Sequence, residues 1–218
     1  MRDLTALLSL QQFADSALPI GGAAHSFGLE SLADAGLLNI DNLESFLAAH
    51  LEESGTLDAA YCALSCELAQ QEALAKWLSI NIQYGARRIA RESRDASAAM
   101  GRRFLNLAAR VSDLDLLVAA SQNSHETHLA PSFGFVAGAL GVEPETAAGA
   151  YLQQSMTALI SACQRLLALG QTRAQEILWN LKPFIVRAAQ TRALSSFTPL
   201  LDIASARHPN QTTRLFIS

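Results

Sequence analysis

The stretch YLQQSMTALISACQRLLALG, residues 151–170, carries the clearest structural pattern in the chain. Its apolar side chains recur every three or four residues, which places them on one stripe of a helix. The members of this stripe are Leu152, Met156, Leu159, Ile160, Cys163, Leu166 and Leu167. Gly170 then occupies a position typical of the residue that follows a helix. We therefore predict a long central helix over about 144–169.

Helical spacing continues along almost the whole chain of 218 residues, and no segment alternates apolar and polar residues as a β-strand does. We predict an all-α, single-domain protein over residues 1–218, an irregular bundle of about nine or ten helices. Breaks between helices are expected near 15–22, 36–41, 54–56, 79–83, 110–112, 123–131, 141–144, 170 and 193–199. The signals for helix starts are two capping-box pairs and two prolines suited to a first turn: Asp41 with Glu44, Ser112 with Asp115, Pro131 and Pro144.

Composition excludes several classes of protein. The net charge of −4 argues against nucleic acid as the main partner, because phosphate binding needs a basic face. No window approaches the roughly 20 apolar residues that span a bilayer, and the first residues lack a signal-peptide pattern. Three cysteines do not suggest a disulfide framework, and we interpret Cys62 and Cys66 as buried core thiols rather than metal ligands. We expect a cytoplasmic protein.

The stretch DSALPIGGAAHSFGLE, residues 15–30, concentrates polar residues around two glycines. It is not a P-loop, because no Lys followed by Ser or Thr comes after the second glycine. We predict a turn at Pro19 and the glycines, then a helix that contains His25 and ends at Gly36. A catalytic base at His25 is an alternative, although no nucleophile elbow accompanies it.

The stretch SHETH, residues 124–128, gathers His125, Glu126 and His128. The zinc-protease pattern needs two histidines four apart, and these are three apart. A structural or surface role is therefore favoured. The alternative function is a helical metal-dependent enzyme that uses His25 or the pair His125 and His128.

The stretch YGARRIARESRDASAAMGRRF, residues 84–104, is rich in arginine. On one helix Arg87, Arg91 and Arg94 would share a face, and Asp95 would pair with Arg91. This face is either simply solvated or a docking surface for an acidic partner, since arginine is favoured at interfaces.

Small residues in the same segment predict a close helix contact. Ser97 and Gly101 lie four apart, on one side of the expected helix. Their short side chains would let another helix approach closely.

The chain ends in HPNQTTRLFIS, residues 208–218, whose last apolar residues are Leu215, Phe216 and Ile217. Chain ends usually fray, and a free apolar tail favours aggregation. Either this tail folds back on its own core or a partner covers it.

Five segments, in this order along the chain, resemble one family of proteins. They are DSALPIGGAAHSFGLE, RESRDASAAMGRRF, HLAPSFGFVAGALGV, RLLALGQTRAQEIL and PLLDIASARHPNQTTRLFIS. Together they are similar to the urease accessory proteins UreF, whose members commonly end in Arg-Leu-Phe-x-Ser. The resemblance covers essentially the whole chain.

The resemblance implies an all-helical maturation factor that is not an enzyme and forms a homodimer. The family binds the accessory protein UreD, also called UreH, and the GTPase UreG, and this assembly delivers nickel to the urease apoprotein. It further implies modulation of the GTPase, with no cofactor and no metal site in the chain itself.

The resemblance also implies which residues meet partners. The matching positions expected at the GTPase or dimer face are Asp15, Ser16, His25, Ser26, Glu30, Arg91, Glu92, Arg94, Arg102 and Tyr151. Those expected in a partner-docking tail at 208–218, which would contact UreD or UreH, are His208, Arg214, Leu215, Phe216 and Ser218.

Overall fold

The computed structural model describes residues 4–123, 126–208 and 214–217, and these form α-helices without any strand. In chain order the helices are α1 (Leu4–Phe13), α2 (Leu29–Asp34), α3 (Leu43–His50), α4 (Thr56–Gln70), α5 (Leu74–Arg87), α6 (Arg91–Ser112), α7 (Asp115–Asn123), α8 (Leu129–Ala139), α9 (Pro144–Leu166), α10 (Gln171–Asn180), α11 (Lys182–Gln190) and α12 (Pro199–Arg207). A short 3-10 turn spans Gly22–Ala24, and a π-helical turn spans Leu51–Gly55. The predicted all-α bundle is confirmed.

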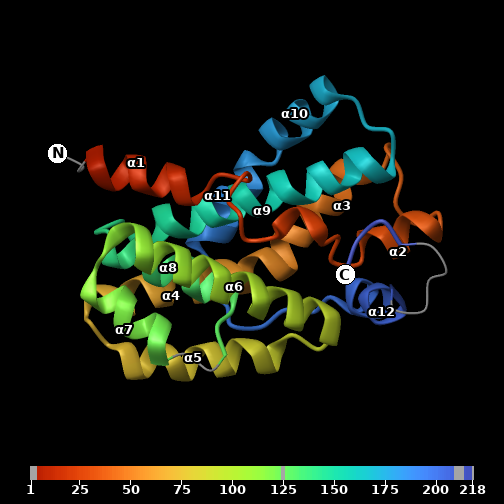
Figure 1. Ribbon diagram of the computed structural model, residues 1–218. Coiled ribbons are helices and arrows are strands. Elements are labelled where there is room, and N and C mark those ends of the chain that lie inside the picture. The colour runs from red at the N-terminus through yellow and green to blue at the C-terminus, as the bar shows by residue number, and fades with distance from the viewer. Residues whose placement is uncertain (1–3, 124–125, 209–213, 218) are drawn as a thin grey trace.

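Helix α9 lies along the middle of the bundle, as its apolar stripe predicted (Figure 1). It packs against α4, α8 and α11. Leu152, Met156 and Cys163 are buried in the core. Burial of one such side chain contributes about 1.5–3 kcal/mol, so the stripe accounts for the central position of this helix.

Helices α4 and α8 make the closest contact in the core. A Cβ atom added at Gly134 would lie 1.9 Å from the carbonyl oxygen of Cys62, and one at Gly138 would lie 2.2 Å from that of Cys66. No side chain fits at such distances, so only glycine allows the two helices to approach this closely. Together with α9 these helices form what we call the central packing unit, α4, α8 and α9.

The three cysteines belong to this core, as predicted. Cys62, Cys66 and Cys163 are buried. Burial raises the pKa of the Cys66 and Cys163 thiols to about 12. The thiols are thus protonated at neutral pH and behave as small apolar groups.

The close approach predicted at Ser97 and Gly101 is also confirmed. A Cβ at Gly101 would lie 2.3 Å from the carbonyl oxygen of Thr127, and the Ser97 hydroxyl accepts the N–H of Leu129 at 3.4 Å. The neighbouring segment runs from Thr127 to Leu129, the first residue of α8.

Two predicted breaks are wrong. No break occurs near 54–56, because the π-helical turn joins α3 to α4 without interruption. None occurs near 79–83 either, since α5 continues through Asn81. The amide of Asn81 donates to the carbonyl of Trp77 and accepts the N–H of His128, so this polar residue is satisfied inside a buried helix.

Some predicted helix ends are confirmed and others are wrong. Pro144 begins α9 as predicted, and Pro131 lies in the first turn of α8. Neither predicted capping box forms: the N-cap of α3 is Asn42, and the Ser112 hydroxyl donates to a carbonyl within α6. Gly170 does not follow α9 as its C′ residue but is the N-cap of α10.

None of the helices in the described parts of the chain is both long enough and apolar enough to cross a membrane.

Candidate functional site

The stretch at residues 15–30 forms two turns before α2 begins. The Asp15 carboxylate accepts the N–H of Ala17 at 2.8 Å, and both Asp15 and Ser16 are exposed. Gly28 has a φ of 90°, which favours glycine, and α2 starts only at Leu29. His25 therefore precedes the helix, contrary to the prediction, because the left-handed Gly28 interrupts any helix begun earlier. Gly36, with a φ of 68°, follows α2 as predicted.

His25 and Ser26 are buried beside these turns. Burial lowers the pKa of His25, and the nearby Arg103 guanidinium lowers it further. The His25 ring packs against Phe27 at 5.9 Å between ring centroids. The Ser26 hydroxyl accepts the N–H of Glu30 at 3.5 Å. Both residues thus support the conformation of the chain that leads into α2.

Glu30 and His208 meet although they are 178 positions apart. The His208 Nε2 lies 2.9 Å from the Glu30 carboxylate on α2, and its Nδ1 lies 2.9 Å from the Glu92 carboxylate on α6. The His208 side chain is fully buried. Figure 1 shows α2 and α12 side by side at this end of the bundle.

The C-terminal tail is fixed to the same carboxylate. Glu30 accepts the N–H of Leu215 at 2.6 Å and that of Phe216 at 3.2 Å. The N–H of Ile217 donates to the carbonyl of Ala24. Tail residues thus lie against the segment that precedes α2 and against α2 itself.

Side chains of the tail alternate between buried and exposed. Phe216 is buried, with the Arg165 guanidinium 4.2 Å from its ring centroid. Leu215 and Ile217 are 65% and 67% exposed. The tail therefore folds back on its own chain through Phe216, while the side chains of Leu215 and Ile217 face outward. That a partner covers these two side chains stays a prediction. We call Glu30, Glu92, His208 and residues 214–217 the terminal junction.

The arginine-rich segment divides into two helices. The break at residues 88–90 separates Arg87 on α5 from Arg91 and Arg94 on α6, so the predicted single face of three arginines is wrong. Arg91 pairs with Asp95 at 3.4 Å as predicted, and its side chain is 86% exposed. Arg102, also on α6, is exposed.

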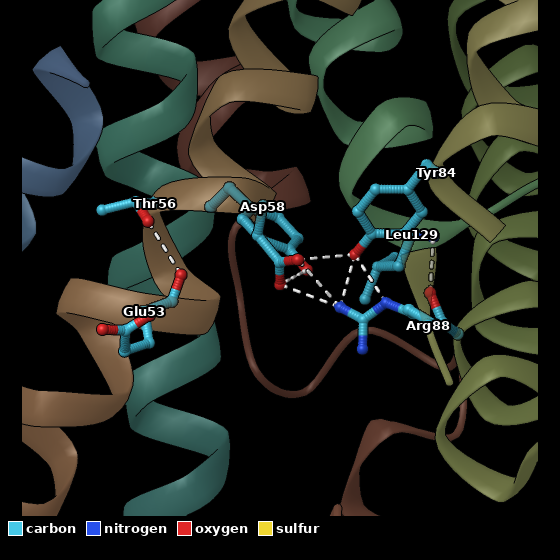
Figure 2. A network of polar contacts seen from close by, with 8 residues as sticks. Glu53, Thr56, Asp58, Tyr84, Arg88 and Leu129 are labelled. Atoms are coloured by element: carbon cyan, nitrogen blue, oxygen red, sulfur yellow. Dashed lines mark hydrogen bonds and ion pairs between the residues drawn. The ribbon is translucent and has the colours of Figure 1, made fainter. Parts of the chain in front are cut away.

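An ion pair that is largely shielded from solvent lies near this break. Figure 2 shows Arg88 facing Asp58 of α4 and the phenol of Tyr84. The Arg88 Nη2 is 2.9 Å and 3.0 Å from the two Asp58 oxygens, and the Tyr84 hydroxyl donates to Asp58 at 2.7 Å. Tyr151, expected at a partner face, is buried here, and its hydroxyl lies 3.4 Å from Asp58.

The electrostatics of this cluster follow from burial. Burial opposes the charge on Arg88, but the Asp58 carboxylate together with the Tyr84 and Tyr151 phenols outweighs that effect and raises the pKa of Arg88. Burial also raises the pKa of Tyr84 and Tyr151, so both phenols stay protonated and can donate. Burial lowers the pKa of the neighbouring His50 to about 4. The cluster is a compensated charge pair rather than a reactive base.

A cavity of about 230 Å³ lies beside this cluster. Its lining includes Ser16, His50, Asp58, Arg88 and Tyr151. Two expected site residues, Ser16 and Tyr151, thus line the same cavity.

Of the histidines of SHETH, the structure describes His128 alone. The His128 Nε2 lies 2.9 Å from Glu126, and burial lowers the pKa of His128 despite that carboxylate. His125 falls outside the described residues. Within residues 4–123, 126–208 and 214–217, no group of three His, Cys, Asp or Glu side chains could hold a metal ion.

Sequence reasoning missed the Asp58 cluster and the link between Glu30 and His208. A signal for the first existed: Asp58 is a lone charge in the apolar run LDAAYCAL of α4. A charge at such a position indicates a buried partner. No local sequence pattern indicated the contact between Glu30 and His208.

Comparison with known proteins decides the family. The family model described as UreF matches residues 37–182, which is more than half of the chain. This chain belongs to the UreF family. The resemblance carried by the five sequence segments is therefore confirmed.

Curated UreF relatives match this chain over nearly its full length. The protein from Trichormus variabilis, named urease accessory protein UreF, is 32% identical over 222 residues, covering 97% of this chain and 95% of its own. That from Paenarthrobacter aurescens is 32% identical, with 97% of each chain covered. That from Bacillus sp. strain TB-90 is 28% identical, covering 97% of this chain and 99% of its own. Their names describe accessory proteins and not enzymes.

Proposed function

We propose that this chain is a urease maturation factor without catalytic activity, which bridges UreD (UreH) and the GTPase UreG in the cytoplasm. In that assembly it modulates the GTPase and supports nickel delivery to the urease apoprotein. The observation that carries the proposal is the terminal junction. Three segments that resemble UreF, far apart in the sequence, converge there through Glu30, Glu92 and His208.

The tail supports a UreD or UreH site. Main-chain hydrogen bonds to Glu30 hold Leu215 and Phe216 in place, while the Leu215 and Ile217 side chains stay exposed. Leu200 and Ile203 on α12 are exposed as well. Ordered, exposed apolar side chains bind a partner with a smaller entropy cost than a disordered tail would.

The first turns of α6 support a UreG site. Arg91 is exposed there, and Arg102 is exposed further along the same helix. Arginine at an exposed helix start can dock an acidic surface or reach a bound nucleotide. The buried residues His25, Ser26 and Tyr151 would act indirectly, by holding these surfaces and the homodimer face in shape.

Truncation tests the UreD assignment. Removing residues 214–218 should abolish co-purification with UreD while the helical circular dichroism signal is kept. A matched variant, Leu215→Ser with Ile217→Ser, keeps Phe216 and its main-chain bonds and should weaken UreD binding on its own. Undiminished binding by the truncated protein would contradict the tail assignment.

Arginine variants test the UreG assignment. If Arg91 or Arg94 acts on bound GTP as an arginine finger, typically worth ~10³–10⁵ in rate, its change to Ala should lower stimulated hydrolysis at least ~10-fold with the complex intact. Loss of the complex would instead assign the residue to docking. Arg110→Ala, at the exposed far end of the same helix, is the control.

A further inference from the structure

The cavity beside Asp58 and Arg88 has a lining that is partly apolar and partly polar. Its volume is about 230 Å³, whereas a cavity needs only about 10–15 Å³ to hold one water molecule. The large apolar side chains of the lining include Ile20, Phe27, Leu57, Met100, Leu129 and Leu159. An ordered water needs about two to four polar partners, which such side chains do not provide. Apolar walls with a few polar groups are typical of sites for small molecules.

Arg88 has one nitrogen that is not engaged by its neighbours. The Nε donates to the Tyr84 hydroxyl at 2.8 Å, and the Nη2 lies 2.9 Å and 3.0 Å from the two Asp58 oxygens. Figure 2 shows the other terminal nitrogen, Nη1, directed away from both Asp58 and Tyr84. In the described part of the chain no hydrogen bond involves Nη1, and Arg88 lines the cavity. Its N–H groups can therefore donate to an acceptor on a molecule held there.

The charges of the cavity lining compensate one another. Two cations, Arg87 and Arg88, line it together with two carboxylates, Asp58 and Asp202. His50 adds no charge at neutral pH, because burial lowers its pKa to about 4. An anion bound here would meet the carboxylates, and a cation would meet the arginines. The lining is therefore suited to an uncharged molecule.

A segment that we call the strap, residues 191–198 between α11 and α12, contributes two residues to the cavity lining. One hydrogen bond joins it to α5, from the Arg87 Nε to the Leu194 carbonyl at 2.9 Å. Another joins it to the π-helical turn, from the Phe197 N–H to the Glu53 carboxylate at 3.2 Å. Most of its side chains are exposed. Segments with so few buried contacts open at a low free-energy cost, so the strap offers a route into the cavity.

We propose that this cavity is a binding site for an uncharged organic molecule with an apolar body and a carbonyl oxygen. The oxygen accepts a hydrogen bond from the Arg88 Nη1, and the body packs against the apolar lining. Serine hydroxyls of the lining, such as those of Ser54 and Ser155, can donate or accept and so suit a further polar group. This site goes beyond the proposed function, because it is measured on the isolated chain without any partner.

Three probes of similar shape test the site: benzamide, benzoate and toluene. Benzamide is uncharged and has a carbonyl oxygen, so it should bind the full-length protein with a Kd of about 1 mM, as expected for a ligand of its size. Toluene lacks the acceptor and benzoate adds a charge, so each should bind at least ~10-fold more weakly. Nitrogen-15 NMR should locate the benzamide-induced shifts at cavity residues such as Ser93 and Ser155. Absence of saturable shifts there would overturn the proposal, and benzoate binding as tightly as benzamide would overturn the ligand class.

Filling the cavity tests its location. Ala158 lines the cavity from α9, and Ala158→Leu should lower the affinity for benzamide at least ~10-fold while amide shifts far from the cavity stay unchanged. Thr146→Leu adds apolar volume at an exposed position of the same helix and should bind benzamide as wild type does. Unchanged affinity in a folded Ala158→Leu protein would mean that benzamide binds elsewhere.

The double variant Asp58→Leu with Arg88→Met tests the role of Arg88 without leaving a charge unpaired. It should bind benzamide and toluene equally, because the donor to the carbonyl oxygen is gone. A retained preference for benzamide would contradict the contact with Arg88.

The strap is tested by the rate of exchange rather than by affinity. Glu53→Ala removes the acceptor of the Phe197 N–H and should speed both association and dissociation of benzamide several-fold. Glu52→Ala, at the neighbouring surface ion pair with Arg187, is the control and should keep the wild-type rates. Equal rates in the two variants would exclude entry past the strap.

Discussion

The central packing unit and the terminal junction are held together by different forces. In the packing unit α8 lies against α4 at glycine positions, and the contacts are apolar and tight. In the terminal junction the Glu30 and Glu92 carboxylates, the His208 ring and main-chain N–H groups of the tail are joined by hydrogen bonds. The core therefore depends on side-chain volume and the junction on hydrogen bonds, and substitutions should affect them in different ways.

The largest effect is expected where a charge lies inside the apolar region. Arg88→Met leaves Asp58 buried without its cation and should lower the free energy of unfolding by about 3–5 kcal/mol. Urea denaturation measures this loss. The double variant Asp58→Leu with Arg88→Met removes both charges and should be more stable than the single variant. A double variant as unstable as the single one would contradict the ion-pair explanation.

Side-chain volume in the central packing unit should affect the free energy of unfolding nearly as much. Gly134→Ala places a Cβ against the Cys62 carbonyl and should cost about 3 kcal/mol, because the helices must separate. Gly149→Ala on α9 is the matched control: its Cβ meets nothing within 4 Å, and the change should stabilise by up to about 1 kcal/mol. Denaturation of both variants distinguishes packing from helix propensity, which predicts stabilisation at both sites.

Acid should weaken the interior through His50. Its pKa is about 4 in the folded protein and about 6.5 when unfolded, so the unfolded chain binds more protons between these values. Stability should fall as pH drops from about 6.5, by up to about 3 kcal/mol at pH 4. In His50→Gln this part of the pH dependence should disappear. An unchanged acid slope would show that other groups cause it.

The smallest effect on the whole protein is expected in the terminal junction. Glu30→Gln weakens charged hydrogen bonds to His208, Leu215 and Phe216, at about 1–3 kcal/mol. Because few core contacts depend on it, hydrogen exchange should accelerate in α12 and the tail while α4, α8 and α9 stay protected. Equal acceleration throughout would mean that the junction is part of the cooperative core.

Much of the helical core could be predicted from the sequence. The stripe of α9 and the burial of the cysteines depend on local periodicity, which can be seen directly in the sequence. The sequence predicts a helix break at Asn81 wrongly, because this polar side chain is hydrogen-bonded inside α5. It also assigns Gly170 to the end of α9, whereas this glycine is the N-cap of α10. The site was less predictable. The resemblance points to Glu30, His208 and Phe216 as site residues. No local sequence pattern indicates that Glu30 is hydrogen-bonded to the other two.

Spacing and residue identity are enough to predict the helical class, the central position of α9, the close contact at Ser97 and Gly101, and the family. Each of these predictions follows from residues that are near neighbours along the chain. The contacts of His208 with α2 and α6, and the pairing of Asp58 with Arg88, depend on the tertiary structure. The physical reason is that a buried charge must find its partner in space, and the partner that folding brings to it can lie anywhere in the sequence.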